Sequence, residues 1–378
     1  MQYNISIMKK VEKIKEGSLY KEVFIALASV GVFAFIGWFL WLPNIQQNLM
    51  SRESPVYIVE MCRSVLLYVY MPFVVWCLVL GELTQNLSQV DKVWSLSPPV
   101  FCWYITYYEA KQHQWTWNYK LVFMSLLITV WGARLTYQFY KKGGYSIRFW
   151  SGEEDYRWVI VRRKMPLLRN RLVFFVFDIG FVCCYQLFLL LSISGVVMVA
   201  TIMVDRAAGD ARNTLNAKDA VIGAMVAILI AIETLSDYQQ QVFQREKYRR
   251  IQKNLSLECS QNHYEIGFNV NGLFAYSRHP NFTAEQLIWV VFYMFSVRNI
   301  SDLDALFQLG GPLNATVAGS ILLIVLFLKS TDLTEDISSA KYPLYRKYQM
   351  NVNRFVDFKL LFRRCFLDGQ NGIKDWLK

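Results

Sequence analysis

Charged residues and histidines are scarce in this sequence, and both shortages exclude classes of function. Only 18% of the 378 residues are Asp, Glu, Lys or Arg, and three are histidines. The seven cysteines show no paired spacing, and Cys183 and Cys184 lie within an apolar run. Zinc sites and disulfide frameworks need such pairs. The sequence therefore predicts neither a bound metal nor a disulfide framework.

Common phosphate-binding and hydrolase patterns are also absent. The chain has no GxGxxG after a strand, no GxxxxGK[ST] loop, no GxSxG elbow and no HExxH helix. It has no internal repeat or low-complexity tract. We expect no cleavable secretory signal, because the first apolar run follows about twenty hydrophilic residues. Triad hydrolysis and metal catalysis are disfavoured.

Hydrophobic residues dominate instead. They make up 54% of the chain, aromatic residues make up 16%, and the mean hydropathy is +0.23. These values indicate a multi-spanning membrane protein, in which a helix needs about 20 apolar residues to cross. The apolar runs lie at about 22–43, 64–84, 93–108, 119–140, 171–203, 219–236, 284–298 and 313–330. The prediction is an all-α membrane bundle of about eight transmembrane helices. Gly180 and Gly195 are expected to tilt or break the long fifth run.

The distribution of basic residues predicts which segments face the cytosol. Lysines precede the first run, residues 141–171 carry nine Lys or Arg against three acids, and residues 237–280 and the tail after Leu328 are also basic. With eight spans, all four segments and both termini are cytosolic. The net charge of +11 is then mostly this bias and predicts no nucleic-acid partner. The predicted domains are a tail and anchor (1–60), one membrane domain (61–362) and a basic tail (363–378).

The most informative segment is YSRHPNFTAEQLIW, from Tyr276 to Trp289. Pro280 suits the first position of a helix, and His279 would then cap it. Arg278, Asn281, Glu285 and Trp289 step by three or four residues and share one helical face. An arginine and free N–H groups at a helix start favour an anion. The alternative is a surface loop that enters a helix and has no further role.

Two segments with charged residues, WGARL and GEEDYRW, lie between residues 131 and 158. Arg134, in WGARL, lies late in the fourth apolar run, where it either serves function or extends to the headgroups. The GEEDYRW segment places three adjacent acids in a basic loop. Acids there suit ribose hydroxyls, and the arginines suit phosphates, but a solvated charge run is the alternative and is favoured for Glu153.

Two further clusters follow. Glu233 and Asp237 are four residues apart on one helical face, and a carboxylate within an apolar run needs a partner such as Arg278 or Arg134. The segment KYPLYRKY places three tyrosines among basic residues. They form either an interfacial aromatic belt or a cover over an adenine ring.

The segment GLFAYSRHPNFTAEQLIW resembles the steroid 5-alpha-reductase-like membrane proteins, which include steroid and sterol double-bond reductases. WGARL, GEEDYRW, SDYQQQVFQREK and KYPLYRKYQMNVNRF look most like a branch of that family without an assigned activity. The resemblance covers roughly residues 65–358. It implies a helical bundle with a cytosol-facing NADPH cavity that opens to lipid, in the endoplasmic reticulum membrane if the protein is eukaryotic.

The resemblance also implies roles for particular residues. Asn281 and Glu285 would contact the nicotinamide end of NADPH, and Trp289 would line that pocket. The other residues implied to bind cofactor are Arg134, Asp155, Tyr156, Arg157, Asp237, Arg278, His279, Tyr345 and Arg354. The expected catalytic residues, on the substrate side, are Glu82, Asp91 and Tyr104, of which an acid and a tyrosine would polarise a substrate ketone.

The function implied is the NADPH-dependent reduction of a C=C bond in a lipid-soluble enone that is steroid-, sterol- or isoprenoid-like. Hydride would reach the β-carbon while an acid or tyrosine stabilises the enolate oxygen. The expected partners are this substrate and membrane lipids, with no obligate protein partner. One alternative is a methyltransferase of the isoprenylcysteine carboxyl type, which uses S-adenosylmethionine and has an RHPxY-like element; Phe282 stands in place of its tyrosine. The other is a non-catalytic lipid-binding membrane protein.

Overall fold

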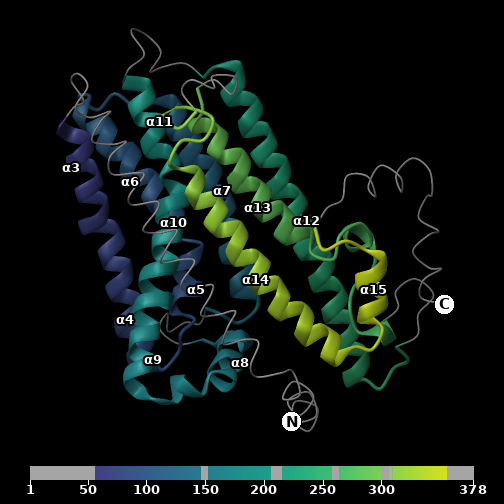
Figure 1. Cartoon of the computed structure of the whole chain (residues 1–378). Helices are drawn as coiled ribbons and strands as arrows, with labels where there is room; N and C mark the ends of the chain where they lie inside the picture. The colour runs from purple at the N-terminus through teal and green to yellow at the C-terminus, as the bar shows by residue number, and fades with distance from the viewer. Residues whose placement is uncertain are drawn as a thin grey trace. The chain divides into compact units, whose positions relative to one another are not determined.

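The computed structural model describes residues 56–145, 152–205, 215–257, 264–298, 306–308 and 310–355. Helices account for all of the regular secondary structure in these ranges, as the sequence predicts (Figure 1). The chain divides into two compact units. The smaller unit comprises residues 1–15, 227–288 and 324–378, and the larger unit comprises residues 16–226 and 289–323. Almost all of the predicted anchor (1–60) and the predicted tail (363–378) lie outside the described residues.

In the described part of the larger unit, α3 (Val56–Val65), η1 (Leu66–Tyr70) and α4 (Met71–Thr84) follow one another as one long helical run. The unit also contains α5 (Gln89–Trp94), α6 (Ser97–Gln112), α7 (Tyr119–Lys141), α8 (Tyr156–Lys164), η2 (Pro166–Arg169), α9 (Arg171–Phe177), η3 (Asp178–Tyr185), α10 (Gln186–Ser194), α11 (Val196–Asp205) and η7 (Met294–Ser296). The helix α6 packs on both α7 and α10 (Figure 1).

Three helices each have residues in both units: α12 (Ala217–Gln252), α13 (Pro280–Tyr293) and α14 (Val317–Lys341). The smaller unit adds η5 (Tyr264–Ile266), η6 (Gly272–Ala275) and α15 (Tyr345–Asn351). Within it, the buried Lys247 of α12 donates a 2.8 Å hydrogen bond to the carbonyl oxygen of Gly267. This bond fastens the loop after η5 to α12.

Five helical runs in the described residues are long and apolar enough to cross a membrane. They are Val59–Thr84, Tyr119–Lys141, Arg171–Met203, Ala217–Gln252 and Val317–Lys341. Each overlaps one of the predicted apolar runs, which confirms the multi-pass helical character. The first predicted run, 22–43, lies outside the described residues. The predicted runs at 93–108 and 284–298 correspond to α6 and α13, which have 16 and 14 residues and are too short to count among the five.

The long fifth run behaves as its glycines suggest. Gly180 lies inside η3, an eight-residue π-helix, and Gly195 separates α10 from α11. The helix α12 is also longer than a crossing needs: its 36 residues span about 54 Å, whereas a bilayer core is about 30 Å thick. One part of α12 must therefore extend beyond the hydrocarbon region.

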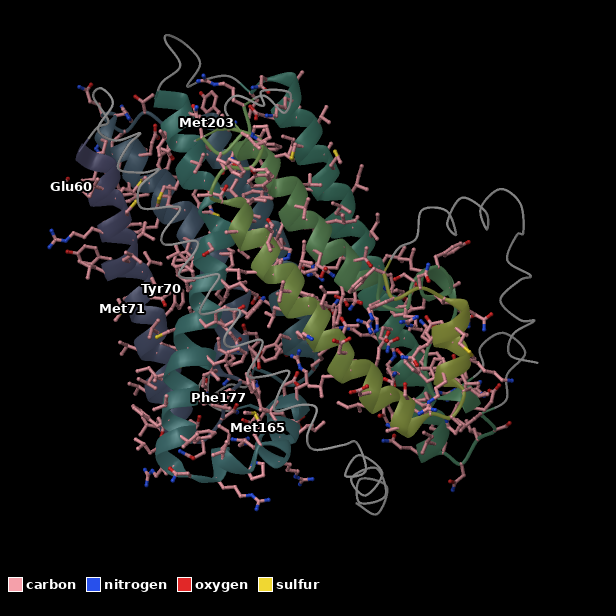
Figure 2. All side chains as sticks on the ribbon, viewed as in Figure 1. Glu60, Tyr70, Met71, Met165, Phe177 and Met203 are labelled. Atoms are coloured by element: carbon pink, nitrogen blue, oxygen red, sulfur yellow. The ribbon has the colours of Figure 1, made fainter. Side chains whose placement is uncertain are left out.

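The larger unit has two opposite ends (Figure 2). Glu60 and Met203 lie at one end, and Met165 and Phe177 lie at the other. Met165 belongs to the segment 141–171, which the basic residues predict to face the cytosol.

Close packing in the larger unit depends on Gly132, in the WGARL segment of α7. A Cβ at this position would lie 2.5 Å from the carbonyl oxygen of Ser95 and 2.7 Å from Cγ of Pro99. Only glycine lets α7 approach the start of α6 this closely. A 2.7 Å hydrogen bond between the hydroxyls of Ser95 and Thr136 holds the same contact one turn further along.

Candidate functional site

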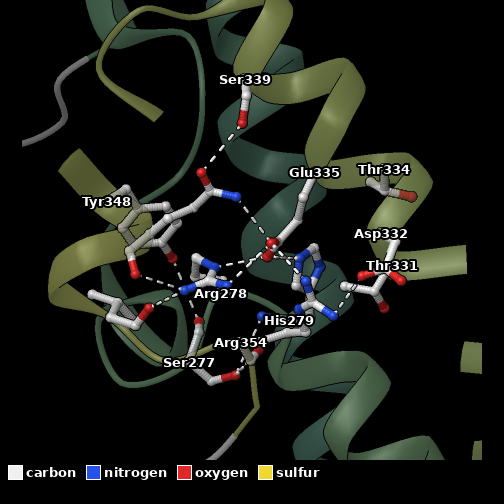
Figure 3. A network of polar contacts seen from close by, with 12 residues as sticks. Ser277, Arg278, His279, Thr331, Asp332, Thr334, Glu335, Ser339, Tyr348 and Arg354 are labelled. Carbon is white, nitrogen blue, oxygen red and sulfur yellow. Dashed lines mark hydrogen bonds and ion pairs between the residues drawn. The ribbon is translucent and has the colours of Figure 1, made fainter. Parts of the chain in front are cut away.

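The Tyr276–Trp289 segment folds as the sequence predicts, with α13 beginning at Pro280. Directly before it, Arg278 forms a buried ion pair with Glu335 of α14 (Figure 3). Nε and Nη2 of Arg278 donate to the two carboxylate oxygens at 2.7 and 3.1 Å. Nε2 of His279 lies 2.9 Å from the same carboxylate, and Nε2 of Gln349 donates to it at 3.0 Å. Glu335 is thus the centre of a polar cluster, which we call the Glu335 network.

The remaining Arg278 donors face the chain after α15. Nη1 donates to the carbonyl oxygens of Gln349, at 3.0 Å, and Val352. The backbone repeats this pairing, since the N–H of Arg278 donates to Asn353 at 2.9 Å and that of His279 donates to Arg354 at 3.1 Å. Protein acceptors therefore engage Nε, Nη1 and Nη2 of Arg278, which favours a positioning role over direct phosphate contact.

Arg354 completes the network from the C-terminal side. Nη1 donates to Asp332 at 2.7 Å, and Nη2 lies 3.4 Å from Glu335. Unlike Arg278, whose side chain is 8% exposed, Arg354 keeps a third of its side chain accessible. Of the two arginines, Arg354 is the one better placed to meet a solute anion.

An aromatic cluster lies beside this network and contains Tyr345. The ring of Phe268 packs edge-on against Tyr345 at 5.0 Å and lies 5.3 Å from Tyr348. The hydroxyl of Tyr348 donates to the carbonyl oxygen of Phe274. Burial, followed by the nearby charge of Glu335, raises the pKa of Tyr345. Tyr345 and Tyr348 are thus buried parts of a core, and the aromatic belt is not their role in this structure.

Asn281, in the first turn of α13, is fixed by Asp237 of α12. Its amide Nδ2 donates to Oδ1 of Asp237 at 3.1 Å. This bond defines the amide orientation, because the nitrogen must face the carboxylate. The amide oxygen has no partner among the residues that the structure describes. Glu285, one turn further along α13, and Glu233, one turn before Asp237, are both buried.

In the larger unit, the GEEDYRW segment packs on residues 85–92. Each segment donates a backbone N–H to a side chain of the other. The N–H of Leu87 donates to the Glu154 carboxylate at 2.9 Å, and the N–H of Asp155 donates to the Ser88 hydroxyl at 2.9 Å. Arg162 pairs with Glu154. These bonds give Glu154 a structural role and leave Glu153 outside the contact.

Asp155 caps α8 and holds Arg157. Its carboxylate accepts from the N–H of Arg157 at 2.9 Å and from Nε and Nη2 at 2.8 and 3.0 Å. Burial alone would raise the pKa of Asp155, but the hydrogen bonds and charge of Arg157 hold it below its usual value. Tyr156 begins α8, and its side chain lies outside the described side chains.

The structure assigns different neighbours to the three predicted catalytic residues. Asp91 accepts a 3.1 Å hydrogen bond from the indole of Trp158, and burial raises its pKa. The Tyr104 hydroxyl bonds to Ser64 on α3. Ser64 precedes Glu82 by 18 residues in one helical run, which separates them by about 25 Å. Tyr104 and Glu82 therefore do not meet at one carbonyl.

Two other predicted residues, Arg134 and Trp289, also belong to the larger unit. Arg134 on α7 is buried. Trp289 packs edge-on against Trp131 with their ring centroids 5.0 Å apart, so WGARL and the end of the α13 segment share one core. The predicted cofactor residues thus form two sets, with Asp237, Arg278, His279, Asn281, Glu285, Tyr345 and Arg354 in the smaller unit and the rest in the larger.

Sequence reasoning missed Glu335, which is the most connected side chain of the site. A signal was present, because Asp332 and Glu335 are three residues apart at the end of an apolar run and so lie on one face. An acid in such a run needs a partner, as Glu233 does.

The family described as "protein of unknown function (DUF1295)" matches residues 76–352, which hold the second half of α4 and all of the elements from α5 to α15. The chain belongs to this family. It is also 35% identical over 278 residues to the uncharacterized protein C594.04c of Schizosaccharomyces pombe, which covers 72% of this chain and 73% of that protein. No solved structure matches the chain.

Proposed function

We propose that this protein is a membrane-embedded NADPH-dependent reductase of a C=C bond in a lipid-soluble enone. The resemblance of the α13 segment to the steroid 5-alpha-reductase-like proteins suggests the reaction. The observation that carries the proposal is the orientation of Asn281: its nitrogen is held by Asp237, and its oxygen is open. A nicotinamide carboxamide presents the N–H donor that such an oxygen accepts.

The smaller unit fits the nicotinamide end better than the phosphates. Asn281 would take the carboxamide, and Glu285 lies one turn along the same helix. Arg354 is a partly accessible cation of the Glu335 network, whereas Arg278 is committed to Glu335 and the backbone. When bound, NADPH would supply the hydride. Arg278 and Glu335 would orient the start of α13, and the apolar bundle would keep water from the reacting carbon.

Binding of the cofactor can be tested by thermal unfolding of detergent-purified protein with NADPH, NADH or S-adenosylmethionine. A ligand at 100 times its dissociation constant stabilises by about 2.7 kcal/mol. We expect NADPH to stabilise the protein. Stabilisation by S-adenosylmethionine alone would support the methyltransferase instead, and stabilisation by none of the three would support a non-catalytic lipid-binding protein.

Variants locate the site. Asn281→Ala, Glu285→Ala and Arg134→Ala should each weaken NADPH binding without preventing membrane insertion. The loss of one hydrogen bond to the carboxamide predicts a decrease of roughly tenfold for Asn281→Ala. Gln286→Ala is the matched control on the same helix, since among the described residues its side chain bonds to the carbonyl oxygen of Phe282 within α13. Equal affinities for all four variants would show that the cofactor binds elsewhere.

Phe282 bears on the methyltransferase alternative. Its ring stacks on His279 at 5.4 Å and packs edge-on against Phe327 at 5.0 Å. Phe282, which stands where the methyltransferases carry a tyrosine, therefore takes part in a contact between aromatic rings.

A further inference from the structure

A second polar site lies in the larger unit, inside two helical runs that are long enough to cross a membrane. Asp178 is the first residue of the π-helix η3, and its side chain is almost completely buried, with the residue 1% exposed. Among the described residues, its Oδ1 accepts a hydrogen bond from the Cys183 thiol, a weak donor, at 3.6 Å. Its Oδ2 is buried and has no hydrogen-bond partner within the described ranges.

Glu82 of α4 lies beside this carboxyl. The preceding residue is Gly81, and a Cβ built there would lie 3.4 Å from Oδ2 of Asp178. Oδ2 therefore faces the turn of α4 that carries Glu82, and α4 packs on η3. Oε1 of Glu82 is also buried and without a hydrogen-bond partner in the described part of the chain.

No described lysine or arginine forms an ion pair with either acid. A charged carboxylate as buried as Asp178, with no cation paired to it, would be very costly, so Asp178 is expected to carry its proton. A protonated carboxyl group has one O–H donor. Asp178 thus presents a hydrogen-bond donor, and its Oδ2 forms no hydrogen bond with any residue that the structure describes.

The outer surface next to this buried pair is apolar. Leu83, next to Glu82, is 76% exposed, and Phe175 and Val176 precede Asp178 on the outer surface of α9. The π-helix adds width to the helix here, and such segments are frequent at functional sites. A ligand for this site is therefore apolar overall and carries a hydrogen-bond acceptor.

We propose that Asp178 and Glu82 bind the carbonyl oxygen of a lipid-soluble ketone or enone. This inference rests on the proposed reductase function, which supplies the enone as substrate class. Asp178 would donate a hydrogen bond to the carbonyl oxygen and so polarise the conjugated C=C bond. The tyrosine that the sequence suggested for this task, Tyr104, lies near Ser64 and not near Glu82.

The test is ketone binding in the absence of NADPH, with 4-cholesten-3-one and its hydrocarbon analogue 4-cholestene as probes in nanodiscs. We expect the wild type to prefer the enone and to lower its carbonyl stretching frequency. Asp178→Leu removes the donor and should weaken enone binding roughly tenfold, with hydrocarbon binding unchanged. Asp178→Asn keeps an N–H donor and should stay within a factor of about three. Ser192→Ala is the control, because among the described residues the Ser192 hydroxyl bonds to the carbonyl oxygen of Phe188 in the same helix.

Equal enone binding by the wild type and Asp178→Leu would overturn the inference, as would equal loss of both probes. If Asp178→Leu does not fold, the test is the carbonyl stretching frequency of the enone bound to the wild type and to Asp178→Asn. An unshifted frequency overturns the inference. A water that bridges Asp178 and the carbonyl oxygen would give this unshifted frequency. NADPH binding is scored separately. A wild type that binds NADPH but shows no preference for the enone refutes this site and leaves the reductase proposal standing.

Discussion

Glu335→Gln should destabilise the protein more than any other conservative change in the smaller unit. The substitution keeps the shape of the side chain but removes the charge that faces Arg278 and His279. The side chains of Glu335 and Arg278 are 3% and 8% exposed, so little water can replace the lost partner. Removal of one member of a buried ion pair costs about 3–5 kcal/mol. Because glutamine still accepts one hydrogen bond, we expect a loss near the lower end, about 3 kcal/mol.

The assay is the free energy of unfolding in mixed detergent micelles. Glu246→Gln on α12 is the matched control, since its partners Arg249 and Arg250 are on the surface of the same helix, and it should change stability little. In a double-mutant cycle, Arg278→Met combined with Glu335→Gln should cost less than the sum of the two single changes. Additive losses, or a Glu335→Gln loss below about 1 kcal/mol, would refute the view that this buried pair joins α13 to α14.

Two further predictions concern the larger unit. Gly132→Ala should lower the free energy of unfolding by about 1–3 kcal/mol in the same assay, because the new Cβ would lie 2.5 Å from the carbonyl oxygen of Ser95. Gly180→Ala is the control, since open space surrounds that position and no clash results. The raised pKa of Asp91 means that folding favours its protonated form. The stability that protonated Asp91 contributes is therefore present below about pH 4 and is lost as the pH rises through the folded-state pKa. Asp91→Asn should remove this pH-dependent loss of stability while keeping an acceptor for Trp158. Identical curves of unfolding free energy against pH for the wild type and Asp91→Asn would contradict this reasoning.

Local chemistry made several elements predictable. The start of α13 follows from Pro280, whose fixed φ and missing N–H suit a first helical turn. The changes of helix type and the helix boundary within the fifth run coincide with Gly180 and Gly195. By contrast, the runs at 93–108 and 284–298 gave helices shorter than a standard crossing, because apolar composition does not distinguish a short buried helix from a membrane span.

The site was less predictable than the helices, because its contacts join residues far apart in the chain. The GEEDYRW segment was expected to bind ribose and phosphate, yet Glu154 bonds to Leu87 and Arg162. An isolated motif does not show whether its acids face a ligand or another loop of the same protein. The cofactor roles of Asp155 and Arg157 remain predictions.

The sequence by itself determined the class of this protein: an all-helical, multi-pass chain in which a proline-led helix carries Asn281 and Glu285 on one face. That information is local, since run length, glycine, proline and helical spacing act within a few residues. Only the tertiary structure decided the partners: Glu335 for Arg278, Asp237 for Asn281, and the turn at Gly81 for Asp178. Burial is the physical reason, because a charge or carboxyl group removed from water must find its counterpart wherever the packed chain brings one.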